Sequence, residues 1–253
     1  MSNLTIPVVV PEHTRKRNQT ANFSPKKITR CLVWAIFFLL LGHIAAFIED
    51  YVRHAYSRTA KNIIRLFDFN LENNVPTWFS ALILAFASVL LFIIYDHKKR
   101  NNIKPAIYWL VLALIFVFLS MDESAQIHEE VANIVRPKLG NHDAGGLLYW
   151  AWVVPYSVFV IGVLAYFLRF MLNLPPLTRN LFFLSGIMYV SGALGLEFLE
   201  GYFFKLYGLN HIYNRILYCV EELLEMGGVT VFIYSLLNYM ASCNISITIG
   251  NKS

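Results

Sequence analysis

Six long stretches of the chain lack charged side chains, and they constrain the fold more than any other feature. Five of them are residues 31–48, 75–95, 105–121, 144–168 and 180–196. The sixth begins at Met226 and meets no charge until Lys252, although only its first part is apolar. A helix needs about 20 apolar residues to cross a hydrocarbon layer about 30 Å thick. We therefore predict an all-α fold, a polytopic membrane bundle of about six transmembrane helices.

The composition argues against an ordinary soluble protein. Hydrophobic residues make up 57% of the 253 residues and charged residues only 15%, whereas about 25% of a soluble chain is charged. A soluble fold of this size could not bury so much apolar surface, so the excess is expected to face a lipid bilayer. Transmembrane β-strands are short and alternate in polarity, which these stretches do not.

The same stretches give the expected organisation of the chain. Residues 1–27 are expected to form a flexible basic tail, residues 28–242 the transmembrane domain, and residues 243–253 a short C-terminal tail. The helices are expected at about 31–50, 75–96, 105–130, 146–171, 179–204 and 214–241. Between the first two, basic and apolar residues are interleaved, which predicts a short helix on the membrane surface.

Lys and Arg are distributed unevenly between the two sides of this predicted bundle. Thirteen of the 21 fall on the side of the two termini, and eight fall on the other side. Because basic loops tend to remain in the cytoplasm, both termini are predicted to be cytoplasmic. The basic residues thus act as topology signals. No zinc-ligand spacing or nucleic-acid motif accompanies them, so no nucleic-acid partner is expected.

The acidic residues show a stronger bias in the opposite direction. On this topology only Glu12 and Asp96 face the cytoplasm, and the other 14 of the 16 face outward. Asp and Glu contribute little to orientation, so this division needs another cause. Some of the outward-facing acids, such as Glu72, Glu129 and Glu130, are expected to be solvated surface charges.

The remaining acids form three clusters, at residues 120–130, 197–200 and 221–225. In a continuous third helix, Asp122, Gln126 and Glu129 would share one face. The second and third clusters lie on helices five and six, which a short loop joins, so these helices are expected to be antiparallel neighbours.

Glycines are expected to bring the second and third clusters together. Gly192 and Gly195 precede the second cluster, and Gly227 and Gly228 follow the third. Small residues allow the backbones of membrane helices to approach closely.

Carboxylates gathered in a poorly solvated place must be protonated or neutralised by cations. Histidine with several carboxylates is a typical ligand set for Mg, Ca, Mn, Fe or Zn, so the cofactor is left open and a divalent metal cation is one candidate. We predict Glu197 and Glu225 as central ligands and His128 as a ligand or proton carrier. The predicted site consists of Asp122, Glu123, His128, Glu197, Glu200, Glu221, Glu222 and Glu225.

Three strings around these residues resemble an uncharacterised family of bacterial multipass inner-membrane proteins. They are FLSMDESAQIHE at 118–129, GALGLEFLEG at 192–201 and EELLEMG at 221–227. The resemblance implies a location in the bacterial inner membrane and no established activity.

A weaker similarity is to membrane hydrolases of the alkaline ceramidase and progestin-receptor type. Their Ser-x-x-x-His element is matched by Ser124 and His128. The later His-x-x-x-His pair, which in that family helps to hold zinc, is absent from this sequence, and six helices are expected in place of seven.

Three functions remain open at this point. The leading hypothesis is a binding or transport protein with an acidic cavity that opens outward and takes a cation or a proton. The second is a metal-dependent membrane enzyme acting on a lipid or isoprenoid group, with His128 as general base. The third is a structural subunit of a membrane complex, in which the polar network only orients helices.

Overall fold

The computed structural model describes residues 19–21, 24–49, 58–139, 146, 148–208, 211–245 and 247–249. The chain divides into two compact units. The smaller unit contains the strands β1 (Gln19–Ala21) and β2 (Ile247–Ile249), which pair antiparallel with Thr20 opposite Thr248. Residues 1–18, the greater part of the expected basic tail, lie outside the described residues.

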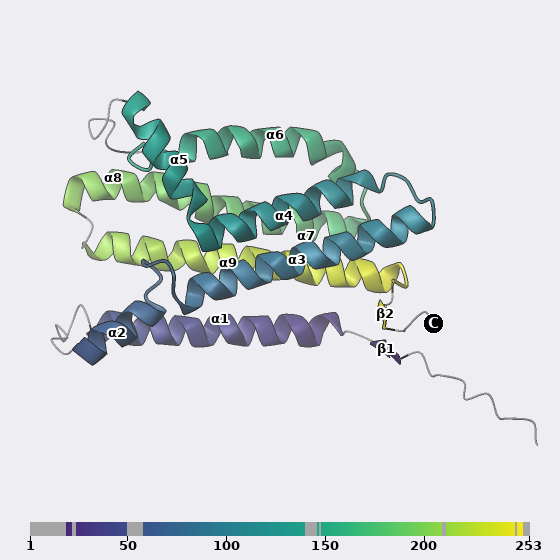
Figure 1. Ribbon diagram of the computed structural model, residues 1–253, viewed down its shortest axis with the longest axis horizontal. Coiled ribbons are helices and arrows are strands. Elements are labelled where there is room, and N and C mark those ends of the chain that lie inside the picture. The colour runs from purple at the N-terminus through teal and green to yellow at the C-terminus, as the bar shows by residue number, and fades with distance from the viewer. Residues whose placement is uncertain are drawn as a thin grey trace, which may run out of the picture. The chain divides into compact units, whose positions relative to one another are not determined.

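The larger unit, Phe23–Ile245, is helical (Figure 1). Its α-helices are α1 (Pro25–Phe47), α2 (Arg58–Phe67), α3 (Val75–Arg100), α4 (Ile107–Ala125), α5 (Ile127–Val135), α6 (Val153–Leu172), α7 (Pro176–Val190), α8 (Glu197–Tyr207) and α9 (Ile212–Ser242). A short 3-10 helix, Arg136–Leu139, follows α5. A π-helical segment, Ser191–Leu196, joins α7 to α8.

Five helical stretches of the described residues are long and apolar enough to cross a membrane. They are α1, α3, α4, α6 and the continuous stretch Pro176–Tyr207. The all-α prediction is confirmed, and these helices fit a multi-pass membrane protein. At 1.5 Å per residue, the 31 residues of α9 are also long enough to span a bilayer. Its first half is less apolar because it carries three glutamates.

The interior of the bundle is built on α3 and α9. Helix α9 contacts α1, α3, α7, α8 and the π-helical segment. More than half of the most apolar window of α3 is buried, against about a fifth in the other four candidate spans. Large apolar side chains on the outer helices, such as Phe38, Val158 and Ile187, are more than 60% exposed. Such exposure suits helices that face lipid.

Away from the acidic clusters, the core is rich in aromatic rings. Phe116 on α4 stacks on Phe232 of α9, with ring centroids 4.6 Å apart. Trp109 of α4 stacks on Tyr239 of α9 at 4.8 Å. These contacts hold α4 against the C-terminal half of α9.

The helix expected over residues 105–130 is interrupted. Gln126 has a left-handed backbone with φ of 56°, which ends α4 and begins α5. The shared face expected for Asp122, Gln126 and Glu129 therefore does not form. The stretch expected at 179–204 remains helical, but its hydrogen-bonding pattern widens to π over Ser191–Leu196.

The helical stretch of α7 and the π-helical segment packs closely on α9 at three of the four predicted glycines. A Cβ atom on Gly228 would lie 2.9 Å from Tyr189 N and 3.0 Å from Ser185 O. A Cβ atom on Gly192 would lie 2.9 Å from Glu221 O and 3.0 Å from Glu225 Cγ. A Cβ atom on Gly227 would lie 3.1 Å from Met188 Cε on α7. The close approach is thus confirmed at Gly192, Gly227 and Gly228, whereas Gly195 has neighbours only on its own helical stretch.

The topology places short elements at one end of the bundle. In Figure 1, α2, α5 and α8 lie at the same end, and the connection between α3 and α4 lies at the opposite end. One of these short helices, α2 (Arg58–Phe67), lies within the segment for which the sequence predicts a helix on the membrane surface.

Candidate functional site

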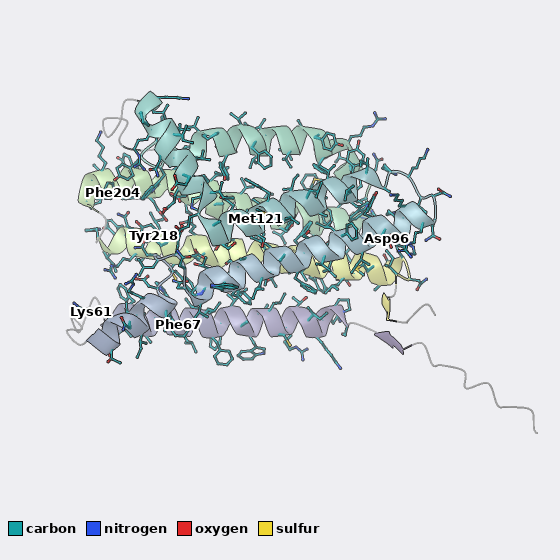
Figure 2. The ribbon with its side chains drawn as sticks, viewed as in Figure 1. Lys61, Phe67, Asp96, Met121, Phe204 and Tyr218 are labelled. Atoms are coloured by element: carbon teal, nitrogen blue, oxygen red, sulfur yellow. The ribbon has the colours of Figure 1, made fainter. Side chains whose placement is uncertain are left out.

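A cavity of about 990 Å³ lies within the helical unit. All eight residues of the predicted site line it, and they come from α4, α5, α8 and α9. The lining also includes Glu72 and Glu129, which brings the number of carboxylates to nine. Figure 2 places Tyr218, another lining residue, at the same end of the bundle as Phe204 of α8, and Asp96 at the opposite end.

Three of the glutamates have the spacing of a metal site. Glu197, Glu200 and Glu221 each offer a carboxylate oxygen, and these oxygens lie within 4.8 Å of one another. Glu200 is only 2% exposed. Its Oε1 atom and the Oε2 atom of Glu197 are buried without a hydrogen-bond partner among the described residues. We call these three residues the glutamate triad.

The local backbone explains how the triad forms. Glu197 and Glu200 lie in the first turn of α8, directly after the π-helical segment, which changes the direction of the side chains that follow it. Glu221 lies on α9. Because Gly192 has no side chain, the π-helical segment can touch α9 at this residue. Substituting a larger residue for Gly192 would therefore push Glu221 away from Glu197 and Glu200.

His128 forms a second group with two carboxylates. Its backbone N–H donates a 2.7 Å hydrogen bond to Asp122 Oδ1, and its Nδ1 atom lies 3.4 Å from the same oxygen. Its Nε2 atom lies 3.3 Å from Glu72 Oε1. The left-handed turn at Gln126 makes this possible because it returns the chain toward Asp122. We call Glu72, Asp122 and His128 the histidine bridge.

The charges of the histidine bridge fix the protonation state of its imidazole. Burial alone lowers the pKa of His128, but hydrogen bonds and charge attraction from Asp122 and Glu72 outweigh it and raise the pKa to about 10. His128 is therefore a cation at neutral pH. Both ring nitrogens of the protonated imidazole face carboxylates, so His128 forms an ion pair with Asp122 and Glu72.

Glu72 was expected to be a solvated surface charge, and that expectation is wrong. The residue lies in the turn before α3, its side chain is 32% exposed, and its Oε2 atom is buried without a partner among the described residues. No helical spacing links it to the other acids, so sequence patterns could not detect it.

The remaining acids of the predicted site lie between these two groups. Glu123, Glu222 and Glu225 are half-buried and line the cavity. Glu225 interacts electrostatically with Glu222, Glu123 and Glu197. The lining thus holds nine carboxylates, while its basic side chains are Arg136 and His128.

Aromatic and apolar side chains complete the cavity. The indole Nε1 of Trp150 and the hydroxyl of Tyr156 are buried without hydrogen-bond partners among the described residues. Beyond them, the lining becomes apolar and follows α4, α6 and α7. Sequence patterns did not predict this part because nothing in an apolar stretch separates residues that face a cavity from those that face lipid.

Two further polar side chains, those of His43 and Ser124, do not line the cavity. His43 accepts a hydrogen bond from the N–H of Phe69 and stacks on its ring at 4.5 Å, as a packing histidine does. Ser124 is exposed and donates to Ser120 O on its own helix, and it does not line the cavity with His128. The Ser-x-x-x-His element therefore does not form a paired site.

Comparison with known proteins identifies one family. No curated protein and no solved structure matches the chain. A family model described as a domain of unknown function, DUF8692, matches residues 31–239, which include every helix of the cavity. The chain therefore belongs to the DUF8692 family, whose description assigns no function.

Proposed function

We propose that this protein binds cations in the acidic cavity of its membrane bundle, as a cation-binding or cation-transporting protein of the bacterial inner membrane. The single observation that carries the proposal is Glu200. Its carboxylate is almost completely buried, has an unpartnered oxygen, and lies beside two further glutamates. Burying a carboxylate oxygen without a hydrogen-bond partner among crowded carboxylates is costly, so a cation shared by the three glutamates is the expected partner.

The charge of the whole cavity supports the same function. Nine carboxylates line it against Arg136 and a protonated His128. Such an excess of negative charge cannot persist within a membrane protein unless protons or cations neutralise it. Three oxygen ligands suit a hard divalent cation such as Mg²⁺, Ca²⁺ or Mn²⁺, and water or further glutamates would complete the coordination.

The position of the cavity supports exchange with one side of the membrane. Glu129 and Arg136 line it from α5 and the 3-10 helix, at the end of the bundle where these short elements gather. The Lys and Arg distribution makes this the extracytoplasmic end, with both termini in the cytoplasm. A cysteine introduced at exposed Lys138 should therefore be labelled from outside intact cells, and labelling from the cytoplasm alone would reverse the orientation.

A second function is favoured by the apolar part of the cavity. A metal held by the glutamate triad could activate water against a lipid or isoprenoid group lying in that part. His128 would not be the general base of such an enzyme, because it is already protonated at neutral pH. One of the unpaired glutamates would have to take that role.

Thermal unfolding of the purified full-length protein with added divalent cations tests cation binding. A cation that binds only the folded state raises the unfolding temperature. We expect Mn²⁺ or Ca²⁺ to raise it in the wild type and in Glu130→Gln, whose exposed residue lies outside the cavity. Glu200→Gln should abolish the shift. An equal shift in Glu200→Gln would refute the proposal.

A further inference from the structure

The cavity is far larger than a metal ion requires. Its volume of about 990 Å³ lies at the upper end of the range for drug-sized ligands, about 300–1,000 Å³. A water molecule takes only about 30 Å³. Most of the remaining space is bounded by apolar side chains, which offer nothing to a hydrated ion. The cavity is therefore large enough for an organic cation.

The apolar arm of the cavity is long. We define it by the lining residues of α4, α6 and α7 that carry no polar group, including Ile115, Phe116, Val163, Phe167, Phe182 and Phe183. On α6 the apolar lining runs from Phe159 to Met171, about 18 Å at 1.5 Å per residue. That length is more than half the hydrocarbon thickness of a bilayer, about 30 Å. An extended alkyl chain fits this shape.

The polar end of the cavity selects the head group by charge. Nine carboxylates line the cavity against two basic side chains, and those that remain ionised require a cationic partner. A phosphate or carboxylate head group would be repelled. Trp150, Trp152 and Tyr156 line the same end, and aromatic faces with carboxylates are the common receptors for ammonium groups.

We propose that the cavity binds a single-chain amphiphile with a positively charged amine head group. The head lies among the carboxylates and the aromatic rings, and the chain lies in the apolar arm. The buried, unpartnered carboxylate oxygen of Glu200 is aimed at the polar end of the same cavity. The inference rests on the proposed cation-binding function and names the ligand class of that site.

Glycine substitutions offer a matched test of the apolar arm. Gly186 on α7 lines the cavity, and a Cβ atom there would meet no atom within 4 Å. Gly162 on α6 has equally open space but does not line the cavity. Gly186→Phe should therefore fill the arm without disturbing the packed helices, and Gly162→Phe places the same ring outside it.

The experiment measures binding to the full-length protein in nanodiscs of zwitterionic lipid, with empty nanodiscs as background. The probes are hexadecyltrimethylammonium, tetramethylammonium and hexadecyl sulfate. We expect saturable binding of hexadecyltrimethylammonium to the wild type and to Gly162→Phe, and binding at least about tenfold weaker to Gly186→Phe. Neither short tetramethylammonium nor the anionic sulfate should bind at the same concentrations.

Competition with Mn²⁺ on the wild type provides a second measurement that needs no variant. If the ammonium head lies among the carboxylates, hexadecyltrimethylammonium should weaken Mn²⁺ binding, and tetramethylammonium should not. Equal amphiphile binding by the two glycine variants, binding of the sulfate, or the absence of competition would each overturn the inference. Retained Mn²⁺ binding in those cases would leave the proposed function intact, whereas its loss in the wild type would refute that function itself.

Discussion

The two halves of α9 differ in what they contribute to the molecule. Its first half carries Glu221, Glu222 and Glu225, which line the cavity. Its second half carries Ile233 and Leu236, both completely buried in the apolar core. The first half therefore incurs a desolvation cost in the absence of a cation, while the second half supplies stability through apolar burial.

This difference separates stability from binding along a single helix. Substitutions in the second half are expected to weaken the fold without changing which ions bind. Substitutions of the glutamates in the first half are expected to weaken binding while leaving the fold intact or making it more stable. Proteins commonly retain such unfavourable charges where function requires them.

The largest expected effect is at Gly228, near the junction of the two halves. Gly228→Leu would place a side chain against the backbone atoms Tyr189 N and Ser185 O, which cannot rotate away. We expect about 4 kcal/mol of destabilisation, above the usual range for overpacking, or loss of folding. Thermal unfolding in detergent measures it. Gly186→Leu, with open space around the glycine, is the control and should change little.

A core truncation in the second half should have the next largest effect. Ile233→Ala removes three buried carbons and should cost about 3 kcal/mol. The matched control is Ile216→Ala in the first half of α9, where the side chain is 53% exposed and the cost should be small. The cation-induced rise in unfolding temperature should persist in both variants. Loss of this rise in Ile233→Ala would show that stability from the second half and cation binding by the first half are not separate.

The histidine bridge should contribute stability that depends on pH. His128→Gln leaves Asp122 and Glu72 without their cation and should cost about 2 kcal/mol at neutral pH. Because the pKa of His128 rises from 6.5 to about 10 on folding, its contribution is complete below about pH 6.5 and is lost as pH rises through 10.

The measurement is the difference in unfolding free energy between wild type and His128→Gln from pH 6 to pH 10. We expect the difference to shrink steadily over this range. A difference that stays constant would show that the imidazole contributes through packing alone. The control is His97→Gln, because His97 lies in the last turn of α3, away from Glu72, which precedes the first turn.

The smallest expected effect has the opposite sign. Glu200→Gln replaces one of the three crowded carboxyl groups of the glutamate triad with a neutral amide, so the cation-free protein should become more stable by about 1 kcal/mol. Thermal unfolding in the presence of a chelator measures this. Marked destabilisation of the variant would indicate that Glu200 has a structural role in the cation-free fold.

Much of the fold could be predicted because apolar length alone identifies spanning helices. The break at Gln126 could not, since no Gly or Pro marks it and its left-handed backbone is held by the contact between His128 and Asp122. The π-helical segment likewise has no local signal. Both irregularities lie beside the cavity, where tertiary contacts override local preference.

Part of the site could also be predicted from the sequence. The eight predicted residues all line one cavity because runs of acid at helix ends are visible in the sequence. The sequence does not reveal which of these residues contact one another. Partition into the glutamate triad and the histidine bridge depends on Glu72, which lies far along the chain from its partner His128.

Direct measurement of bound Mn²⁺ tests the central claim, that the glutamate triad holds a cation. Purified full-length protein would be equilibrated by dialysis against Mn²⁺, and the metal bound per chain would be counted. We predict saturable Mn²⁺ binding by the wild type and by Glu130→Gln, with the tightest site lost in Glu197→Gln, Glu200→Gln and Glu221→Gln. Equal binding by the triad variants and the wild type would contradict the account.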